Sequence, residues 1–243
     1  MGSRRSKPQR TERAEEREQS RIRDHFGVVL VLLIITVFFS ISAPNKSWAW
    51  LATTATLAAS LTVAILVSGA QKRVVGAGIA LAASGLGMST VIALTQEDAR
   101  RYLSVTSLLL TLVAMGAIIR RVRVHAEINM LTILGAVCIY VLLGMSFAFI
   151  FECVGEFGSR PFFTAHEAGT RSDYTYFSFV TMATVGYGDL TAQGGLGRAF
   201  AVTEGLLGQI YLVTTVAALV GNLGRTRTPT KEIAPVREEG GSE

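Results

Sequence analysis

The stretch TMATVGYGDL, Thr181 to Leu190, decides the fold of this chain because it places a short polar segment between two long apolar runs. It contains Gly186 and Gly188, several small or hydroxylated residues, and one acid, Asp189. A segment of this kind between apolar runs raises the question of what a membrane-like sequence does with it.

The residues just before the glycines predict a short helix, SDYTYFSFVTMA (Ser172–Ala183), which is aromatic and apolar all round. We expect Ser172 or Asp173 to cap its start. A helix of this length spans only about 18 Å, half of a membrane. It must therefore stop midway and return, and non-helical backbone at membrane depth is tolerated only where it lines a water-filled path. The sequence predicts a re-entrant segment.

The rest of the chain reads as membrane helices. Half of the 243 residues are apolar and 17% are charged, and a bilayer core of about 30 Å requires roughly 20 apolar residues in a helix. Six runs meet or approach this length: Phe26–Ala43, Trp48–Ala70, Val74–Thr95, Tyr102–Ile119, Ile128–Phe151 and Ala199–Leu223. We predict an all-α membrane protein with six transmembrane helices and the re-entrant segment between the fifth and sixth.

The net charge of +5 reflects membrane topology rather than nucleic-acid binding. Lys and Arg gather at the cytoplasmic ends of membrane helices. They crowd the tail before the first run, and they follow the second, fourth and sixth runs: Lys72 and Arg73; Arg120, Arg121 and Arg123; Arg225, Arg227, Lys231 and Arg237. This alternation predicts both termini in the cytoplasm. We expect the first run to be retained, because it is longer than the apolar part of a usual signal peptide.

The return strand can bind a cation through its backbone. Gly186 and Gly188 can adopt left-handed dihedral angles, so consecutive carbonyl oxygens can turn to one side while Val185 and Tyr187 point away. Four copies around an axis would stack rings of oxygens that replace the water shell of a bare cation. The C-terminal end of the preceding helix carries partial negative charge, which favours a cation at the centre.

Thr181–Asp189, TMATVGYGD, resembles the signature of potassium channels and fits the pattern T-x-x-T-V-G-Y-G-D in full. The resemblance covers about Ile128–Leu223, an outer helix, pore helix, filter and inner helix. It implies a homotetramer in the lipid bilayer and conduction of K⁺ as the permeant ion, without a cofactor. It also implies a filter made by Thr184, Val185, Gly186, Tyr187 and Gly188.

The resemblance assigns roles to residues around the filter. Asp189 would enrich cations at the outer mouth, and Tyr176, Phe177 and Thr181 would support the filter from the pore helix. Gly208 lies where the family has a hinge, although close helix packing also selects glycine in membranes. The positions expected to line the cavity below the filter are Gln209, Leu212 and Val216.

Two positions depart from the family pattern. Val180 stands where some channels carry a carboxylate that promotes inactivation, so we do not expect inactivation of that kind. Glu204 lies inside the sixth run, and an acid within a membrane is a functional candidate by default. We expect its carboxyl to reach water or Thr181.

The first four runs do not form a voltage sensor. Tyr102–Ile119 contains no Lys or Arg, whereas a sensor needs basic residues that cross the field. We therefore expect no steep voltage dependence.

The sequence divides into a charged tail (1–25), a four-span module (26–119), a pore domain (128–223) and a short tail (224–243). Cys138 and Cys153 lie about 22 Å apart on one predicted helix, too far for a disulfide. Short loops and few cysteines fit a bacterial inner membrane. No constellation typical of an enzyme is present. Two alternatives stay open: a potassium transporter subunit, and a non-conducting sensor or regulatory subunit.

Overall fold

The computed structural model describes residues 26–42, 47–67, 72–95, 100–124, 130–164 and 169–223. The predictions for the two charged tails fall outside these residues. The described part of the chain is helical, with one isolated antiparallel β-bridge between Phe163 and Ala192. The predicted all-α class is confirmed.

Each predicted apolar run is helical over the residues that the structure describes. A first helix, Phe26–Ser42, is followed by α2 (Ser47–Val67), α3 (Lys72–Thr95), α4 (Arg100–Val124), α5 (Met130–Phe157), the short α6 (Arg171–Met182) and α7 (Gly195–Leu223). Among the described residues, three stretches are long and apolar enough to cross a membrane: Arg101–Arg123, Thr132–Phe157 and Gly195–Gly221. The apolar stretches Phe26–Ser42, Ala52–Ile65 and Val75–Val91 are shorter. Six complete crossings remain a prediction.

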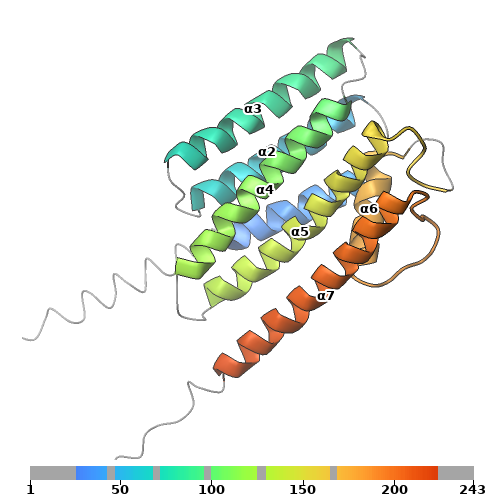
Figure 1. The fold of residues 1–243 in the computed structure, drawn as a ribbon. Coiled ribbons are helices and arrows are strands. Elements are labelled where there is room, and N and C mark those ends of the chain that lie inside the picture. The colour runs from blue at the N-terminus through green and yellow to red at the C-terminus, as the bar shows by residue number, and fades with distance from the viewer. Residues whose placement is uncertain are drawn as a thin grey trace, which may run out of the picture.

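The helices pack side by side, with α3 at one edge and α7 at the other (Figure 1). The main core joins the first helix, α2, α4 and α5, and its fully buried side chains include Leu33, Leu61, Ile118 and Leu142. Because α4 packs directly on α5, the four N-terminal helices rest against the outer helix of the predicted pore domain. By contrast, α7 is largely exposed in the single chain.

The first helix also contacts the short helix α6 through polar side chains. The hydroxyls of Ser40 and Thr175 lie 2.9 Å apart, and the Ser172 hydroxyl donates to the Ile41 carbonyl at 2.6 Å. Hydrogen bonds between helices contribute about 0.6 kcal/mol each in membranes. The N-terminal module is therefore bonded to the element that carries the predicted filter.

The start of α6 differs from the prediction by one residue, and its cap is Thr170 rather than Ser172 or Asp173. Thr170 and Asp173 form a reciprocal capping box, in which the Thr170 hydroxyl accepts from the Asp173 amide and the Asp173 carboxylate accepts from the Thr170 amide at 2.8 Å. Asp173 therefore occupies the third helical position. The T-x-x-D spacing of Thr170 and Asp173 carries this signal, whereas the predicted helix begins at Ser172.

Aromatic rings hold the N-terminal end of α6 against α5, the loop that contains Phe162 and Phe163, and the loop that contains Ala192. We call this set the outer aromatic cluster; its members are Phe147, Phe151, Phe162, Phe163, Tyr174 and Phe177. The loop containing Phe162 is also hydrogen-bonded to the loop after the return strand, because the Gln193 amide donates to the Phe162 carbonyl at 2.8 Å. The return strand thus lies between an anchored helix and an anchored loop.

Candidate ion pathway

The backbone of the return strand alternates in handedness. Thr184, Gly186 and Gly188 have φ angles of 56°, 54° and 82°, whereas Val185 and Tyr187 are not in the positive region. Such alternation allows successive carbonyls to face the same side of a strand. The sequence predicted it for the glycines; the left-handed Thr184 adds a third position, and a β-branched residue there is unusual.

The strand is joined to the end of α6 by short backbone hydrogen bonds. The Thr184 amide donates to the Thr181 carbonyl at 3.0 Å, and the Val185 amide donates to the Val180 carbonyl at 2.9 Å. Val180 and Thr181 thus hold the inner end of the strand in place. Residues 184–189 are otherwise exposed in the single chain, with Tyr187 72% and Val185 50% accessible.

Tyr176 supports the outer end of the strand. Its ring stacks on that of Tyr187 with centroids 6.4 Å apart and an interplanar angle of 4°. Its hydroxyl donates to the Asp189 carboxylate at 2.9 Å. The structure therefore brings Tyr176, Tyr187 and Asp189 together, and the hydrogen bond fixes the position of the only acid in the stretch.

Phe177 lies mainly in the outer aromatic cluster, away from the ring of Tyr187. Its ring centroid is 5.1 Å from that of Phe151 and 5.5 Å from that of Phe163. Phe177 is buried, whereas Tyr176 is partly exposed. Adjacent positions on α6 face different partners, so within one chain Phe177 packs on Phe151 and Phe163, whereas Tyr176 stacks on Tyr187.

The expected hinge residue, Gly208, lies against the end of α6. A Cβ atom at this position would lie 2.7 Å from Met182 Cγ and 3.2 Å from the Met182 carbonyl oxygen. The helix α7 continues through it without a break. Close packing of α7 against the C-terminal end of α6 therefore needs a glycine here, and a hinge role remains a prediction.

The expected cavity residues Gln209, Leu212 and Val216 lie on α7 at positions exposed in the single chain. Their spacing of three and four residues places them along one side of the helix. They are free to face a central cavity if copies of the chain surround an axis.

We expected Glu204 to reach water or Thr181, and this prediction is wrong. The Glu204 side chain is fully buried and forms a hydrogen bond with Ser178 of α6 instead. The Ser178 hydroxyl lies 2.5 Å from Glu204 Oε1 and 2.7 Å from the Gly144 carbonyl oxygen of α5. Gly144 packs closely against α6, since a Cβ there would lie 2.8 Å from Met182 Cε and 3.0 Å from Phe179 Cε1. One serine therefore joins α5, α6 and α7 behind the return strand.

A buried ion pair near the outer end of α5 was missed by sequence reasoning. Arg171 Nε lies 3.3 Å from Glu152 Oε1, with side chains 8% and 3% exposed. The Arg171 guanidinium also lies over the Phe149 ring, 5.4 Å from its centroid. The sequence shows Glu152 at the end of an apolar run and Arg171 before the short helix. No sequence pattern indicates that these two residues pair.

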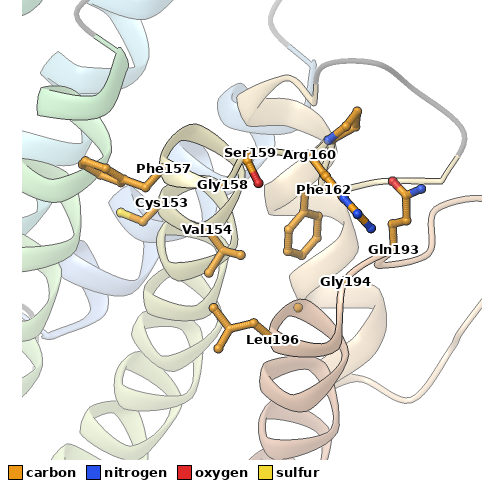
Figure 2. A pocket seen from close by; sticks show the side chains of 12 residues that line it. Cys153, Val154, Phe157, Gly158, Ser159, Arg160, Phe162, Gln193, Gly194 and Leu196 are labelled. Carbon is orange, nitrogen blue, oxygen red and sulfur yellow. The ribbon is translucent and has the colours of Figure 1, made fainter.

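A hollow of about 490 Å³ opens between the outer ends of α5 and α7. Figure 2 shows Cys153, Val154 and Phe157 of α5 on one side and Phe162, Gln193 and Leu196 on the other. Cys153 is partly exposed, whereas Cys138 is buried, and both are free thiols. The hollow places a free thiol near the expected outer surface.

Residues 135–224 match the family model described as Ion channel. The matched region contains α5 from Gly135 onward, α6, the return strand and α7, so it coincides with the elements just described. No curated protein matches the chain. The family match and the long apolar helices support an ion channel in a membrane, and they point away from an enzyme.

Proposed function

We propose that the chain is one subunit of a potassium-selective channel, in which four copies form a filter from the carbonyl oxygens of Thr184, Val185, Gly186 and Tyr187, with Gly188 at its outer end. The observation that carries the proposal is the alternation of φ along Thr184–Gly188 in a strand that follows a half-membrane helix. Rings of carbonyl oxygens can replace the hydration shell of K⁺.

The exposure of the strand supports assembly of several copies. Residues 184–189 are accessible in one chain, yet irregular backbone at membrane depth must be buried in protein or line a water-filled path. A hollow of about 670 Å³ beside the strand, lined by Tyr176, Tyr187, Val202 and other residues, offers space for a neighbouring subunit. Four copies around one axis would satisfy both requirements. The corresponding mass is four times the 26.0 kDa of the subunit.

We assign supporting roles to the neighbouring residues. Asp189, held by Tyr176, concentrates cations at the outer mouth, and Thr181 anchors the inner end of the strand. Gln209, Leu212 and Val216 line the cavity, and Gly208 is the position where α7 would bend if the inner gate moves. We place the channel in the inner membrane of a bacterium, with six spans, both termini in the cytoplasm, no nucleic-acid partner and no steep voltage dependence.

The test is ion flux through purified protein in liposomes, with K⁺ gradients compared to Na⁺ gradients and Ba²⁺ as a blocker. We expect flux that prefers K⁺ and is blocked by Ba²⁺, together with a tetrameric mass. Flux coupled to a second ion would favour a transporter subunit. A folded tetramer that passes no ion under any gradient would favour a non-conducting subunit.

A further inference from the structure

Glu204 occupies an unusual place for an acid. It lies nine residues into α7, about 13 Å along the helix, and its exposed fraction is 0% within a single chain. Its burial comes from contacts of α7 with α5 and α6 of the same chain, the elements that it packs on in Figure 1. Assembly is therefore not needed to remove this carboxyl from water.

The hydrogen bonds of Ser178 indicate whether the Glu204 carboxyl is charged or neutral. Ser178 Oγ lies at hydrogen-bond distance from two oxygens, the Gly144 carbonyl at 2.7 Å and Glu204 Oε1 at 2.5 Å. A carbonyl and an ionised carboxylate can only accept, and a serine hydroxyl has one hydrogen to donate. Two hydrogen bonds among these three oxygens need two hydrogens. An uncharged Glu204 supplies the second, so that it donates to Ser178 while Ser178 donates to Gly144.

The other carboxylate oxygen gives the same indication. Glu204 Oε2 is buried and has no hydrogen-bond partner in the described part of the chain. An unpaired carbonyl oxygen of a neutral acid costs far less than an unpaired charged oxygen in a medium that excludes water. Glu152 presents the opposite case, because Arg171 lies beside it and stabilises its negative charge.

The charged groups of the packed elements do not supply a counter-charge. The helix α5 contains no Lys, Arg or His, and its titratable side chains are Cys138, Tyr140, Glu152, Cys153 and Glu156. On α6, Arg171 and Asp173 lie in the first turn, one to two turns before Ser178, and bond Glu152 and Thr170. On α7 itself, the Arg198 guanidinium donates to the Ala192 carbonyl.

We propose that Glu204 is a proton-binding site that holds the pore helix in its conducting position. In the protonated form, α6 is bonded through Ser178 to both α5 and α7. When the proton leaves, the single Ser178 hydrogen can serve only one of the two acceptors, and the buried charge draws in water. Ser178 lies one turn before Met182, where α6 ends and the filter strand begins. Loss of the proton therefore loosens the support of the filter and stops conduction.

The protonation state can be measured without any ion flux. In infrared spectra of the full-length protein in lipid, we expect a carbonyl stretch of a protonated carboxyl at neutral pH. It should be lost in Glu204→Gln and retained in Glu152→Gln, which is the matched buried acid with an ionic partner. A spectrum in which Glu204→Gln loses no such band would overturn the proposal.

The effect on conduction rests on the proposed K⁺ flux and is tested by its pH dependence in liposomes. We expect a plateau at neutral pH and a decline at alkaline pH of at least about tenfold per pH unit above the midpoint, because each of the four proposed subunits has one Glu204 that can release a proton. Glu204→Gln should conduct at neutral pH and lack the decline, because its amide donates to Ser178 and cannot ionise.

An equal alkaline decline in Glu204→Gln would reject the link between this proton and conduction. If that variant does not assemble, the wild type alone tests the link between the proton and conduction. The infrared band of the protonated carboxyl and the K⁺ flux must then be lost over the same pH range. Loss over separate pH ranges would contradict the proposal. A wild type that passes no K⁺ at any pH would instead count against the channel function, while the infrared comparison would still decide the protonation of Glu204.

Discussion

At the level of single residues, the return strand depends on backbone angles that most side chains avoid. Gly186 has a φ of 54°, and a Cβ added there would meet no atom within 4 Å in the single chain. The cost of an alanine is therefore conformational, about 1–2 kcal/mol per left-handed residue in each subunit. Four such costs fall on one filter.

We expect Gly186→Ala to abolish K⁺ flux while the protein still forms its oligomer, because the strain is relieved by rotating carbonyls away from the axis. Flux in liposomes and mass by light scattering measure the two properties. Gly194→Ala is the matched control: that glycine also has open space around it, but its φ is not positive. Equal flux in the two variants would argue against a filter at Gly186.

The hydrogen bond from the Tyr176 hydroxyl to the Asp189 carboxylate can be removed without removing the Tyr176 ring. Removing the hydroxyl in Tyr176→Phe keeps the ring on Tyr187 but frees the Asp189 carboxylate. We expect a lower preference for K⁺ over Na⁺, measured as the ratio of the two fluxes. Since residues joined by a hydrogen bond do not act additively, Tyr176→Phe should change nothing further in an Asp189→Ala background. A full additional effect there would mean that Tyr176 acts through another partner.

At the level of elements, the position of α6 depends on the buried pair between Glu152 of α5 and Arg171 of α6. Removing one partner of a buried pair costs about 3–5 kcal/mol, because the other charge stays buried and uncompensated. We therefore expect Glu152→Gln to lower the thermal unfolding temperature of the protein in detergent. Arg160→Gln, in the exposed loop after α5, is the control and should leave it unchanged. Equal stability of both variants would show that the pair contributes little.

The helices and the left-handed glycines of the return strand could be predicted from the sequence, whereas the contacts between elements could not. Apolar runs and the glycine pattern are local signals, and they predicted the helix bounds to within a few residues at most ends. Glu204–Ser178, Glu152–Arg171 and Ser40–Thr175 join residues 19 to 135 positions apart. Their pairing depends on the rotation and offset of whole helices, which hydrophobic runs do not specify. The capping box at Thr170 is local, and its spacing could have been recognised.

At the level of the whole molecule, the orientation in the membrane can be tested through the two free thiols. Cys153 lines the hollow at the outer ends of α5 and α7, and Cys138 is fully buried. We expect a membrane-impermeant maleimide added outside intact cells to label the wild type and not Cys153→Ser, with Cys138→Ser labelled like the wild type. Labelling that requires access from the cytoplasm would reverse the proposed orientation.

The placement of charges on α4 bears on how the four N-terminal helices respond to voltage. Between Arg101 and Arg120, α4 carries no Lys or Arg. Arg101 lies over the Phe157 ring, 5.7 Å from its centroid, at the end of α4 nearest the outer end of α5. A voltage sensor moves three to four charges per subunit, each contributing about 2.3 kcal/mol per 100 mV. Since α4 has no charge within its apolar part, a shift along its axis would move little charge through the field.

We therefore expect the macroscopic conductance in planar bilayers to stay nearly constant over about 100 mV on either side of zero. Arg101→Gln should leave this weak voltage dependence unchanged, because Arg101 lies at the end of the helix rather than within it. A steep rise of conductance with voltage, or a gating current, would mean that charges outside the apolar part of α4 cross the field. Packing of α4 on α5 would then transmit voltage to the pore helix, rather than only hold it in place.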